Sequence, residues 1–257
     1  MGSDLNDTAR KFSAVYPVMD NAELRRMRGL KIAAILREAL AGKKINGILD
    51  IGCSNALVLD TVVNELDPDF AVGIDMDTAA APPPTDKRNV VTGDAMSLPL
   101  RSKCMDIILC NHTYEHVPDP HKMFFEINRV LRDDGIVYFS AMNARWPMEP
   151  HYHLPFIHWL PKKISRAILR TRGYPAGYLE KPLTTPKLRD LVSEFEIHDY
   201  TVKVIANPKK YHAQDIVRFA FFGKIYRVVA GVFYGFLPGY LWVLRKRDTA
   251  PVQTGKS

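Results

Sequence analysis

Cysteine is scarce in this chain of 257 residues: it contains only Cys53, Cys104 and Cys110, and no two of them are spaced as C-x-x-C. An odd number without metal-ligand spacing argues against a disulfide framework and a zinc site, so we expect no metal and a reducing, cytoplasmic location. The opening M-G-S-D-L-N-D-T lacks the basic and apolar regions of a secretory signal. The most apolar stretch, 228–244, is interrupted by three glycines and a proline, which argues against a membrane span.

Acidic residues are the minority charge, with 28 Asp and Glu against 35 Lys and Arg and a net charge of +7. A hydrophobic content of 47% and a charged content of 25% are those of a folded domain with insertions, which excludes wholesale disorder. The basic residues gather in short clusters. These indicate either solvated helix faces or attraction to phosphate, on an anionic membrane or a phosphorylated substrate. No nucleic-acid-binding motif accompanies them, so we expect no nucleic acid partner.

The stretch around which the chain is organised is 47–56, G-I-L-D-I-G-C-S-N-A. An apolar run leads to an acid, a glycine and small polar residues, and an apolar-periodic segment begins at Leu57. This pattern predicts a buried strand, a tight turn and a helix N-terminus, a geometry that lets backbone N–H groups approach a ligand.

Along the next hundred residues, apolar segments with the pattern of strands alternate with segments that have the periodicity of helices. We expect strands at 70–75, 89–92, 104–110 and 136–141, with helices between them, which indicates βαβ units and a parallel sheet covered on both faces. Asp50, Asp75, Asp94 and Asn111 all fall at carboxyl ends of these strands, where such sheets bind ligands. For Asp75 a helix N-cap is the alternative, but three prolines at 82–84 disfavour an ordinary helix after it.

The flanking segments predict the following organisation. Residues 1–44 form N-terminal accessory helices, one capped by Asp20 with Glu23 as a capping box. Residues 45–142 and 184–246 form the core, with a helix at 185–195 and strands at 196–205 and 240–244. Residues 143–183 are a lid insertion, 207–237 an amphipathic aromatic helical insertion, and 247–257 a disordered tail.

The order of these signals resembles the class I S-adenosylmethionine-dependent methyltransferases, and especially the small-molecule group that includes ubiquinone and menaquinone biosynthesis enzymes. The matching motifs are L-D-I-G-C-S-N-A, V-G-I-D, G-D-A, S-L-P-L, M-D-I-I, E-H-V-P-D-P and N-R-V-L-R-D-D-G-I-V-Y-F-S, all between 49 and 140. The resemblance implies a doubly wound, Rossmann-like sheet of seven mostly parallel strands with an antiparallel last strand, plus lid insertions. It also implies S-adenosylmethionine as cofactor.

The resemblance assigns cofactor-binding roles to nine residues. Four would surround the methionine moiety and the turn (Asp50, Gly52, Cys53 and Ser54), two the ribose and adenine (Asp75 and Met76), two the adenine edge (Asp94 and Ala95), and Asn111 the methionine end. The chain departs from the family at Ser54 and Ala56, where glycine is usual. Side chains there disfavour positive φ, so we expect weakened or displaced binding, and a non-catalytic module with this fold is an alternative.

Methyl transfer to oxygen benefits from a general base, and histidine suits that role near neutral pH. The candidates are His112 and His116 after the fourth strand, and His151, His153 and also His158 in the lid. Packing at the strand–helix turn is the alternative for His116. His151 and His153 with Glu149 lack the further ligand that a zinc site needs, and simple lid structure is their other interpretation.

The segment 213–237 carries aromatic residues around most of a helix, with basic residues between them. This pattern is typical of a helix in a membrane interface, although an oligomer interface or a covered hydrophobic pocket fits as well. We therefore predict O-methylation of a hydroxyl on a lipophilic or lipid-linked small molecule, at the inner face of the membrane. The alternatives are a non-catalytic module and an N- or C-methyltransferase of a soluble natural-product metabolite. The sequence does not determine the oligomeric state.

Overall fold

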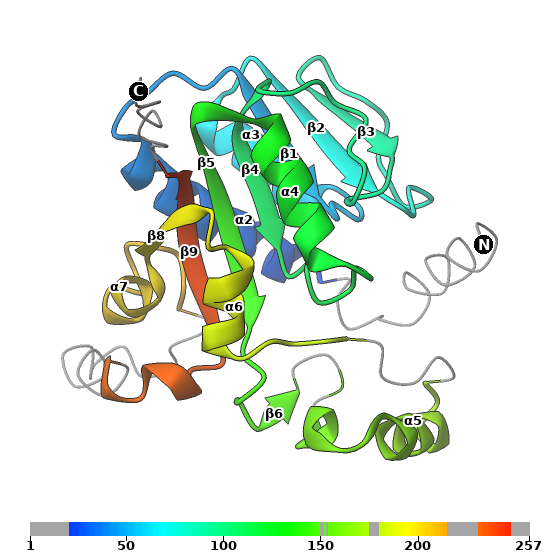
Figure 1. Ribbon diagram of the computed structural model, residues 1–257. Helices are drawn as coiled ribbons and strands as arrows, with labels where there is room; N and C mark the ends of the chain where they lie inside the picture. The colour runs from blue at the N-terminus through cyan, green and yellow to red at the C-terminus, as the bar shows by residue number, and fades with distance from the viewer. Residues whose placement is uncertain (1–20, 150–151, 153, 175–179, 215–230, 248–257) are drawn as a thin grey trace, which may run out of the picture.

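A seven-stranded sheet forms the centre of the computed structural model, which describes residues 21–149, 152, 154–174, 180–214 and 231–247 (Figure 1). The strand order is β3-β2-β1-β4-β5-β9-β8. The strands are β1 (Gly47–Ile51), β2 (Phe70–Asp75), β3 (Arg88–Thr92), β4 (Met105–Asn111), β5 (Leu131–Met142), β8 (Phe195–Asp199) and β9 (Gly239–Lys246). Only β9 runs antiparallel to its neighbours in this sheet, β5 and β8. The predicted mostly parallel sheet with an antiparallel last strand is confirmed.

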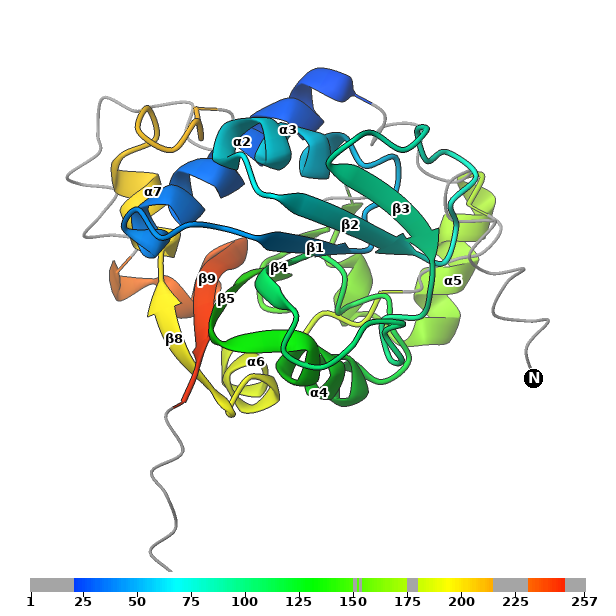
Figure 2. The same cartoon turned by 90° about the horizontal axis from the view of Figure 1, so that it is seen from above.

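Helices cover both faces of the sheet (Figure 2). On one face lie α2 (Ala22–Leu40), α3 (Leu57–Leu66) and α7 (Thr201–Ala206), and on the other α4 (Pro120–Val130) and α6 (Thr185–Leu191). Successive strand side chains point to opposite faces, so Ile107 joins the cluster under α2 and α3, whereas Ile108 joins the cluster under α4 and α6. Burial on both faces explains the continuous apolar runs in the sequence.

The N-terminal helix differs from the prediction in two respects. Its N-cap is Asn21, whose Oδ1 accepts from the N–H groups of Glu23 at 3.0 Å and Leu24 at 3.2 Å; the predicted cap, Asp20, lies outside the described residues. In addition, Ile32 and Leu36 are fully buried in the same cluster as the central strands, so α2 is a core helix and not an accessory one.

The predicted strand at 196–205 is wrong in its second half. β8 ends at Asp199, whose side chain accepts from the backbone N–H of Thr201 at 2.8 Å, and α7 begins there. The β-branched run T-V-K-V-I favoured a strand, but burial of Val204 against the core overrides that propensity. The predicted helix at 185–195 is likewise shorter, since α6 ends at Leu191.

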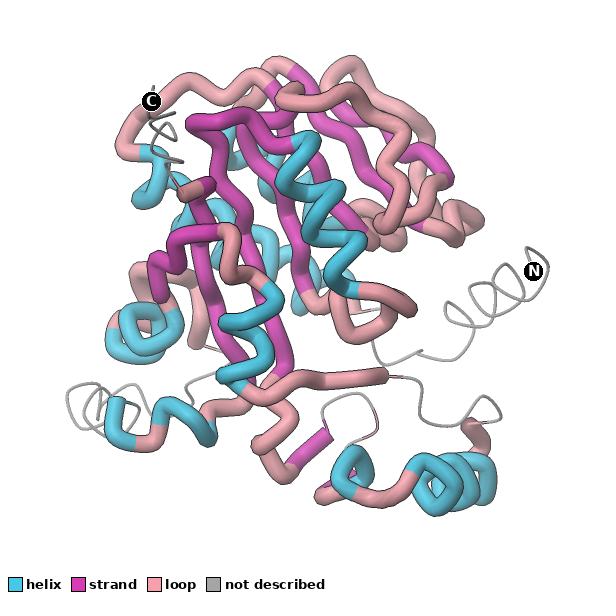
Figure 3. Tube along the Cα trace, viewed as in Figure 1, coloured by secondary structure: helices cyan, strands magenta, loops and turns pink. Residues whose placement is uncertain are grey.

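Beyond β5 the chain leaves the sheet and forms a separate small layer at the end where β5 finishes (Figures 1 and 3). Its elements are β6 (Met148–Glu149), β7 (Leu154–Pro155), the 3₁₀ turn η2 (Ile157–Trp159) and α5 (Lys162–Thr171), around a buried cluster of Tyr152, Ile157 and Leu169. That this layer acts as a lid stays a prediction.

Two further predicted segments lie largely outside the described residues. Most of the aromatic insertion, 215–230, and the tail 248–257 are among these, so the predicted aromatic helix and disordered tail stay predictions. The described end of the insertion contains the 3₁₀ turn η4 (Tyr234–Phe236) before β9. No helix in the described ranges is long and apolar enough to cross a membrane.

Candidate functional site

The turn after β1 contains three residues with positive φ: Gly52, Ser54 and Ala56. Gly52 has φ of 76°, a left-handed conformation that favours glycine, and a Cβ added there would lie only 3.0 Å from the side chain of Thr113. Thr113 itself donates a hydrogen bond from Oγ1 to the carbonyl of Ile51 at 2.8 Å. Thr113 thus contributes to the turn after β1. The sequence did not single it out, because its local pattern does not indicate a contact with Ile51.

Ser54 and Ala56 occupy left-handed positions, with φ of 51° and 56°. A left-handed conformation costs an L-residue about 1–2 kcal/mol, a cost that glycine avoids. The chain therefore keeps the shape of the turn despite the missing glycines. Compared with a turn that has glycine at both positions, it leaves less space beside the backbone and keeps the strain of two left-handed L-residues.

Asp75, at the carboxyl end of β2, faces this turn. Its Oδ2 accepts from the backbone N–H of Ser54 at 2.7 Å, and its Oδ1 accepts from that of Asp77 at 3.0 Å. Each carboxylate oxygen has a further lone pair, so the carboxylate can also accept from two hydroxyls of a ribose. The sequence prediction for Asp75 is thus geometrically feasible and stays a prediction.

Asp50 is a buried carboxyl group at the end of β1. Burial, followed by the negative charge of Asp75, raises its pKa from the ordinary 3.8 to about 7, while the charge of Arg25 opposes the rise. Within the described part of the chain, no residue donates a hydrogen bond to this carboxyl group. A cationic group of a ligand would satisfy it, because buried carboxylates are ordinarily paired.

Arg25 reaches this site from the first turn of α2. Its Nη1 donates to Asn55 Oδ1 at 3.0 Å, which links the N-terminal helix to the turn between β1 and α3. Thirty residues separate the two partners. No sequence spacing indicates such a contact, and neither residue was anticipated.

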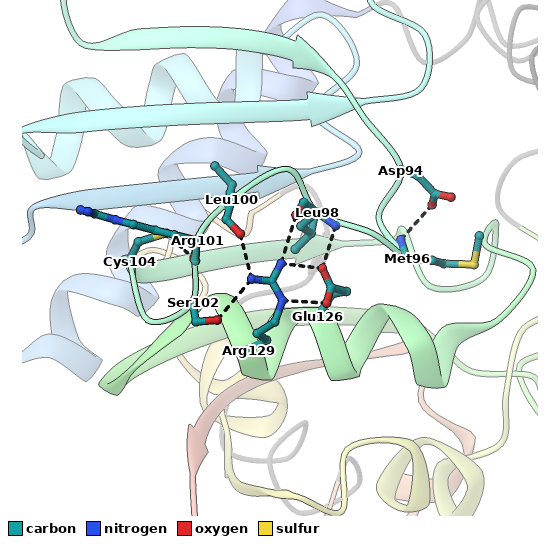
Figure 4. A network of polar contacts seen from close by, with 9 residues as sticks. All are labelled: Asp94, Met96, Leu98, Leu100, Arg101, Ser102, Cys104, Glu126 and Arg129. Atoms are coloured by element: carbon teal, nitrogen blue, oxygen red, sulfur yellow. Dashed lines mark hydrogen bonds and ion pairs between the residues drawn. The ribbon is translucent and has the colours of Figure 1, made fainter.

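The loop after β3 carries Asp94 and is held against α4 by one ion pair (Figure 4). Asp94 Oδ1 accepts from the N–H of Met96 at 2.8 Å. Arg129 contacts both carboxylate oxygens of Glu126, at 2.8 and 2.7 Å, and also donates to the carbonyls of Leu98 at 3.0 Å and Leu100 at 2.8 Å. Glu126 in turn accepts from the N–H of Leu98 at 2.8 Å. These bonds fix the loop that positions Asp94.

His112 lies just past the carboxyl end of β4, with φ of 56°. Its ring joins two neighbours: Nδ1 lies 3.3 Å from Glu115 Oε1, and Nε2 lies 3.0 Å from Ser140 Oγ on β5. The imidazole keeps about a third of its surface exposed, whereas Glu115 is fully buried. Burial alone would raise the pKa of Glu115, but the hydrogen bond from His112 and the charges of His112 and His116 lower it below its ordinary value.

The other candidates occupy different surroundings. His116 donates its backbone N–H to Thr113 at 3.0 Å, and its ring is half-buried in the turn before α4. His158 places Nε2 3.2 Å from the carbonyl of Ala144, and burial lowers its pKa. His151 and His153 lie outside the described residues. The structure therefore brings together His112 and two unanticipated partners, Glu115 and Ser140.

The remaining predicted cofactor residues lie in the same region of the chain. Cys53 is buried next to Gly52, and burial raises the pKa of its thiol far above the ordinary value, so it stays a neutral thiol. Met76 follows β2 and is half-buried, Ala95 is buried beside Asp94, and Asn111 ends β4. Among the residues that the structure describes, no three His, Cys, Asp or Glu side chains are arranged to hold a metal ion.

A family model described as a methyltransferase domain matches residues 49–139. This range runs from the middle of β1 into β5 and includes the turn, Asp75, Asp94 and His112. Residues 49–139 thus carry a methyltransferase domain. The predicted family and its cofactor, S-adenosylmethionine, are thereby confirmed for this part of the chain.

Named relatives agree with the methyltransferase assignment. The ubiquinone biosynthesis O-methyltransferase of Photorhabdus laumondii is 28% identical over 133 residues, which cover 47% of this chain and 52% of the relative. That of Pasteurella multocida is 23% identical over 148 residues, covering 49% and 58%. The chain thus spans little more than half the length of these relatives.

Solved structures share the fold at low identity. A chain from the complex with the Haloferax volcanii Trm112 methyltransferase activator superposes with a TM-score of 0.58 at 12% identity, covering 94% of this chain and 98% of that one. The plantazolicin methyltransferase BpumL, solved with S-adenosylhomocysteine, superposes with a TM-score of 0.57 at 16% identity, covering 93% and 90%.

The residues of the methyltransferase domain fit S-adenosylmethionine chemically. The cofactor carries an ammonium and a sulfonium group, and Asp50 is a buried carboxyl group that no described residue satisfies with a hydrogen bond. Its ribose carries two hydroxyls, which match the free acceptor capacity of Asp75. Asp94 Oδ2 has no partner among the described residues and can accept from an adenine amino group.

Proposed function

We propose that this chain is an S-adenosylmethionine-dependent methyltransferase that methylates a hydroxyl group of a lipophilic or lipid-linked small molecule. The observation that carries the choice of oxygen is the placement of His112 between Glu115 and Ser140. Transfer to oxygen requires removal of a hydroxyl proton, and a partly exposed imidazole at the carboxyl ends of β4 and β5 can take it.

The two neighbours fix the state of the His112 ring. Glu115 is an ionised acceptor, so it accepts from Nδ1–H and leaves the lone pair on Nε2. In the absence of an acceptor molecule, the Ser140 hydroxyl donates to that lone pair. A substrate hydroxyl that takes the place of the serine donor gives its proton to Nε2. The carboxylate of Glu115 then stabilises the imidazolium that forms.

S-adenosylmethionine supplies an activated methyl group on a positively charged sulfur. The chain's own contribution is to bind and orient: Asp50 and Asp75 hold cationic and hydroxyl groups, and the loop fixed by Arg129 presents Asp94. Alignment of acceptor and methyl supplies much of the rate enhancement in such displacements.

The lipophilic character of the acceptor is supported by the names of the relatives, which act in ubiquinone biosynthesis, and by exposed apolar groups near β9. Within the segment 213–237, the side chains of Val232, Phe233 and Phe236 are exposed among the described residues. Contact of this segment with the cytoplasmic face of a membrane belongs to the same proposal.

The proposal is tested by transfer of labelled methyl from S-adenosylmethionine to paired acceptors, a catechol with an isoprenoid chain and the corresponding aromatic amine. We expect the catechol to be methylated and His112→Asn to lower kcat by about 10²–10⁴-fold. His121→Asn, on the exposed side of α4, is the matched control and is expected to keep the wild-type rate. If His112→Asn keeps the wild-type kcat, or if only the amine is methylated, the hypothesis of an oxygen acceptor is refuted. Absence of both transfer and cofactor binding would favour the non-catalytic module.

A further inference from the structure

The small layer beyond β5 exposes large apolar side chains on its surface. We call these residues and the basic residues around them the lid patch. Its apolar members are Met148 (40% exposed), Phe156 (49%), Trp159 (52%), Leu160 (37%) and Ile164 (49%). The rings of Phe156 and Trp159 pair with centroids 5.0 Å apart. All five lie between residues 148 and 164, in one small layer. Clusters of exposed apolar side chains mark interaction sites, whereas isolated ones are common on folded proteins.

The same layer is strongly cationic. Between residues 150 and 172 the chain has five basic residues and no Asp or Glu. The basic members of the lid patch are Lys162, Lys163, Arg166, Arg170 and Arg172. Lys162, Lys163, Arg166 and Arg172 are exposed and form no ion pair within the described ranges.

Helical periodicity separates these groups into three faces of α5. Ser165 and Leu169 are buried against the rest of the layer, Ile164 and Ala167 are exposed, and the lysines and Arg166 lie on a third side. The two lysines also stand in the first turn, where positive charge opposes the helix dipole and no acidic side chain compensates it. An external anion would remove that unfavourable interaction.

The lid patch continues toward the exposed aromatic residues near the C-terminal strand. Trp159 donates from Nε1 to the carbonyl of Ala144 at 2.7 Å. Next to Ala144, the guanidinium of Arg145 lies 5.9 Å from the centroid of Phe236, which is itself 58% exposed. Asn143 donates to the carbonyls of Gly235 at 3.0 Å and Leu237 at 2.8 Å. The segment 143–145 therefore contacts both Trp159 and the turn that carries Phe236.

We propose that the lid patch docks on an anionic phospholipid membrane, with its aromatic side chains in the interface and its basic side chains on lipid phosphates. Exposed aromatic and aliphatic groups beside a surplus of cations are the combination that binds such surfaces. The layer lies at the end of the sheet where β5 finishes (Figure 1). The parallel strands β1, β2 and β4 finish at the same end, so Asp50, Asp75 and His112 lie there too. Docking would therefore turn the site toward the membrane. Docking would also let the methyl acceptor enter the site from the bilayer. That consequence rests on the proposed methyltransferase function, whereas the docking itself does not.

Vesicle co-sedimentation of the full chain tests this proposal, with phosphatidylcholine vesicles compared to vesicles containing 30% phosphatidylglycerol. We expect binding to the anionic vesicles only. Lys162→Gln/Lys163→Gln is expected to weaken it about 25-fold, about 5-fold for each charge removed. Lys122→Gln/Lys209→Gln removes the same charge from exposed positions outside the patch and is expected to bind like the wild type.

Depth is tested separately with acyl-brominated lipid, which quenches indole fluorescence only at the bilayer. Quenching is expected in the wild type and is expected to be lost in Trp159→Phe. Equal binding by both double variants, or equal binding to neutral vesicles, would overturn the proposal. Binding to poly(U) without vesicle binding would also overturn it, in favour of a nucleic acid. Vesicle binding requires neither cofactor nor acceptor, so a failed methyl-transfer assay leaves this outcome unaffected.

Discussion

The buried carboxyl group of Asp50 makes the stability of the free protein depend on pH. Its pKa rises from 3.8 to about 7 on folding, because the group is buried and lies near the charge of Asp75. At about 1.4 kcal/mol per pKa unit, the difference corresponds to roughly 4 kcal/mol. Because the folded pKa is the higher one, the folded state is, with respect to this group, most stable below about pH 4, where the carboxyl group is neutral in both the folded and the unfolded state; roughly 4 kcal/mol of that stability is lost as the pH rises through about 7, because the buried group must then ionise.

Replacing the group with a neutral isostere removes this term. Asp50→Asn is expected to match the wild type in free energy of unfolding near pH 4 and to exceed it by up to about 4 kcal/mol at pH 8. Denaturant unfolding at both pH values measures the difference. Asp86→Asn, an exposed aspartate before β3, is the matched control and is expected to show no such pH trend. The reasoning is refuted if Asp50→Asn is no more stable than the wild type at pH 8, or if their difference is the same at both pH values.

The same carboxylate is expected to be stabilised by a cationic ligand. With a pKa of about 7, roughly one tenth of Asp50 is ionised at pH 6 and nine tenths at pH 8. The wild type should thus bind S-adenosylmethionine about tenfold more tightly at pH 8 than at pH 6. Asp50→Asn should bind it weakly and with little pH dependence, and a wild-type affinity that falls as the pH rises would contradict this role.

Three further predictions concern the turn, the base and the loop. Ser54→Gly removes the strain of a left-handed serine and should raise the free energy of unfolding by about 1 kcal/mol. Ala167→Gly, in the regular helix α5, is the control and should lower the free energy of unfolding by about 1 kcal/mol. If denaturant unfolding shows the same loss of stability for both variants, residue 54 is not strained. Glu115→Gln removes the carboxylate that lies 3.3 Å from His112 Nδ1 and should lower kcat by about 10²-fold; a wild-type kcat would contradict the positioning role. Arg129→Ala removes the hydrogen bonds that hold the loop shown in Figure 4 and should raise the Kd for the cofactor by about tenfold. The side chain of Arg101 points away from the ion pair, so Arg101→Ala is the control and should leave the Kd unchanged. Equal Kd values for the two variants in calorimetry would exclude this effect.

The sequence predicted the part of the fold that local pattern determines. Strands buried on both faces give continuous apolar runs, and the acids at their ends, such as Asp50 and Asp75, lie where the run stops. The first strand, turn and helix were therefore predicted almost to the residue. The segment 200–205 was not, because its β-branched residues favour a strand, whereas the hydrogen bond from the Thr201 N–H to Asp199 and the burial of Val204 stabilise a helix.

The site was predictable only where each residue follows its own strand. His112 was a candidate because it follows β4, but its partner Ser140 comes to it through the pairing of β4 with β5, in which Asn111 lies opposite Ser140. Glu115 stood in a motif that the sequence singled out, without a role. The contact of Arg25 with Asn55 depends on how α2 packs over the sheet, which no local pattern determines.

The most direct test of the methyltransferase site is calorimetric titration of the full chain with S-adenosylmethionine at pH 8. We expect one binding site per chain, with a Kd at least tenfold higher in Asp75→Asn and unchanged in Asp86→Asn, because only Asp75 faces the turn of residues 52–56. Absence of binding at millimolar cofactor, or equal affinity in all three proteins, would contradict the assignment of this site.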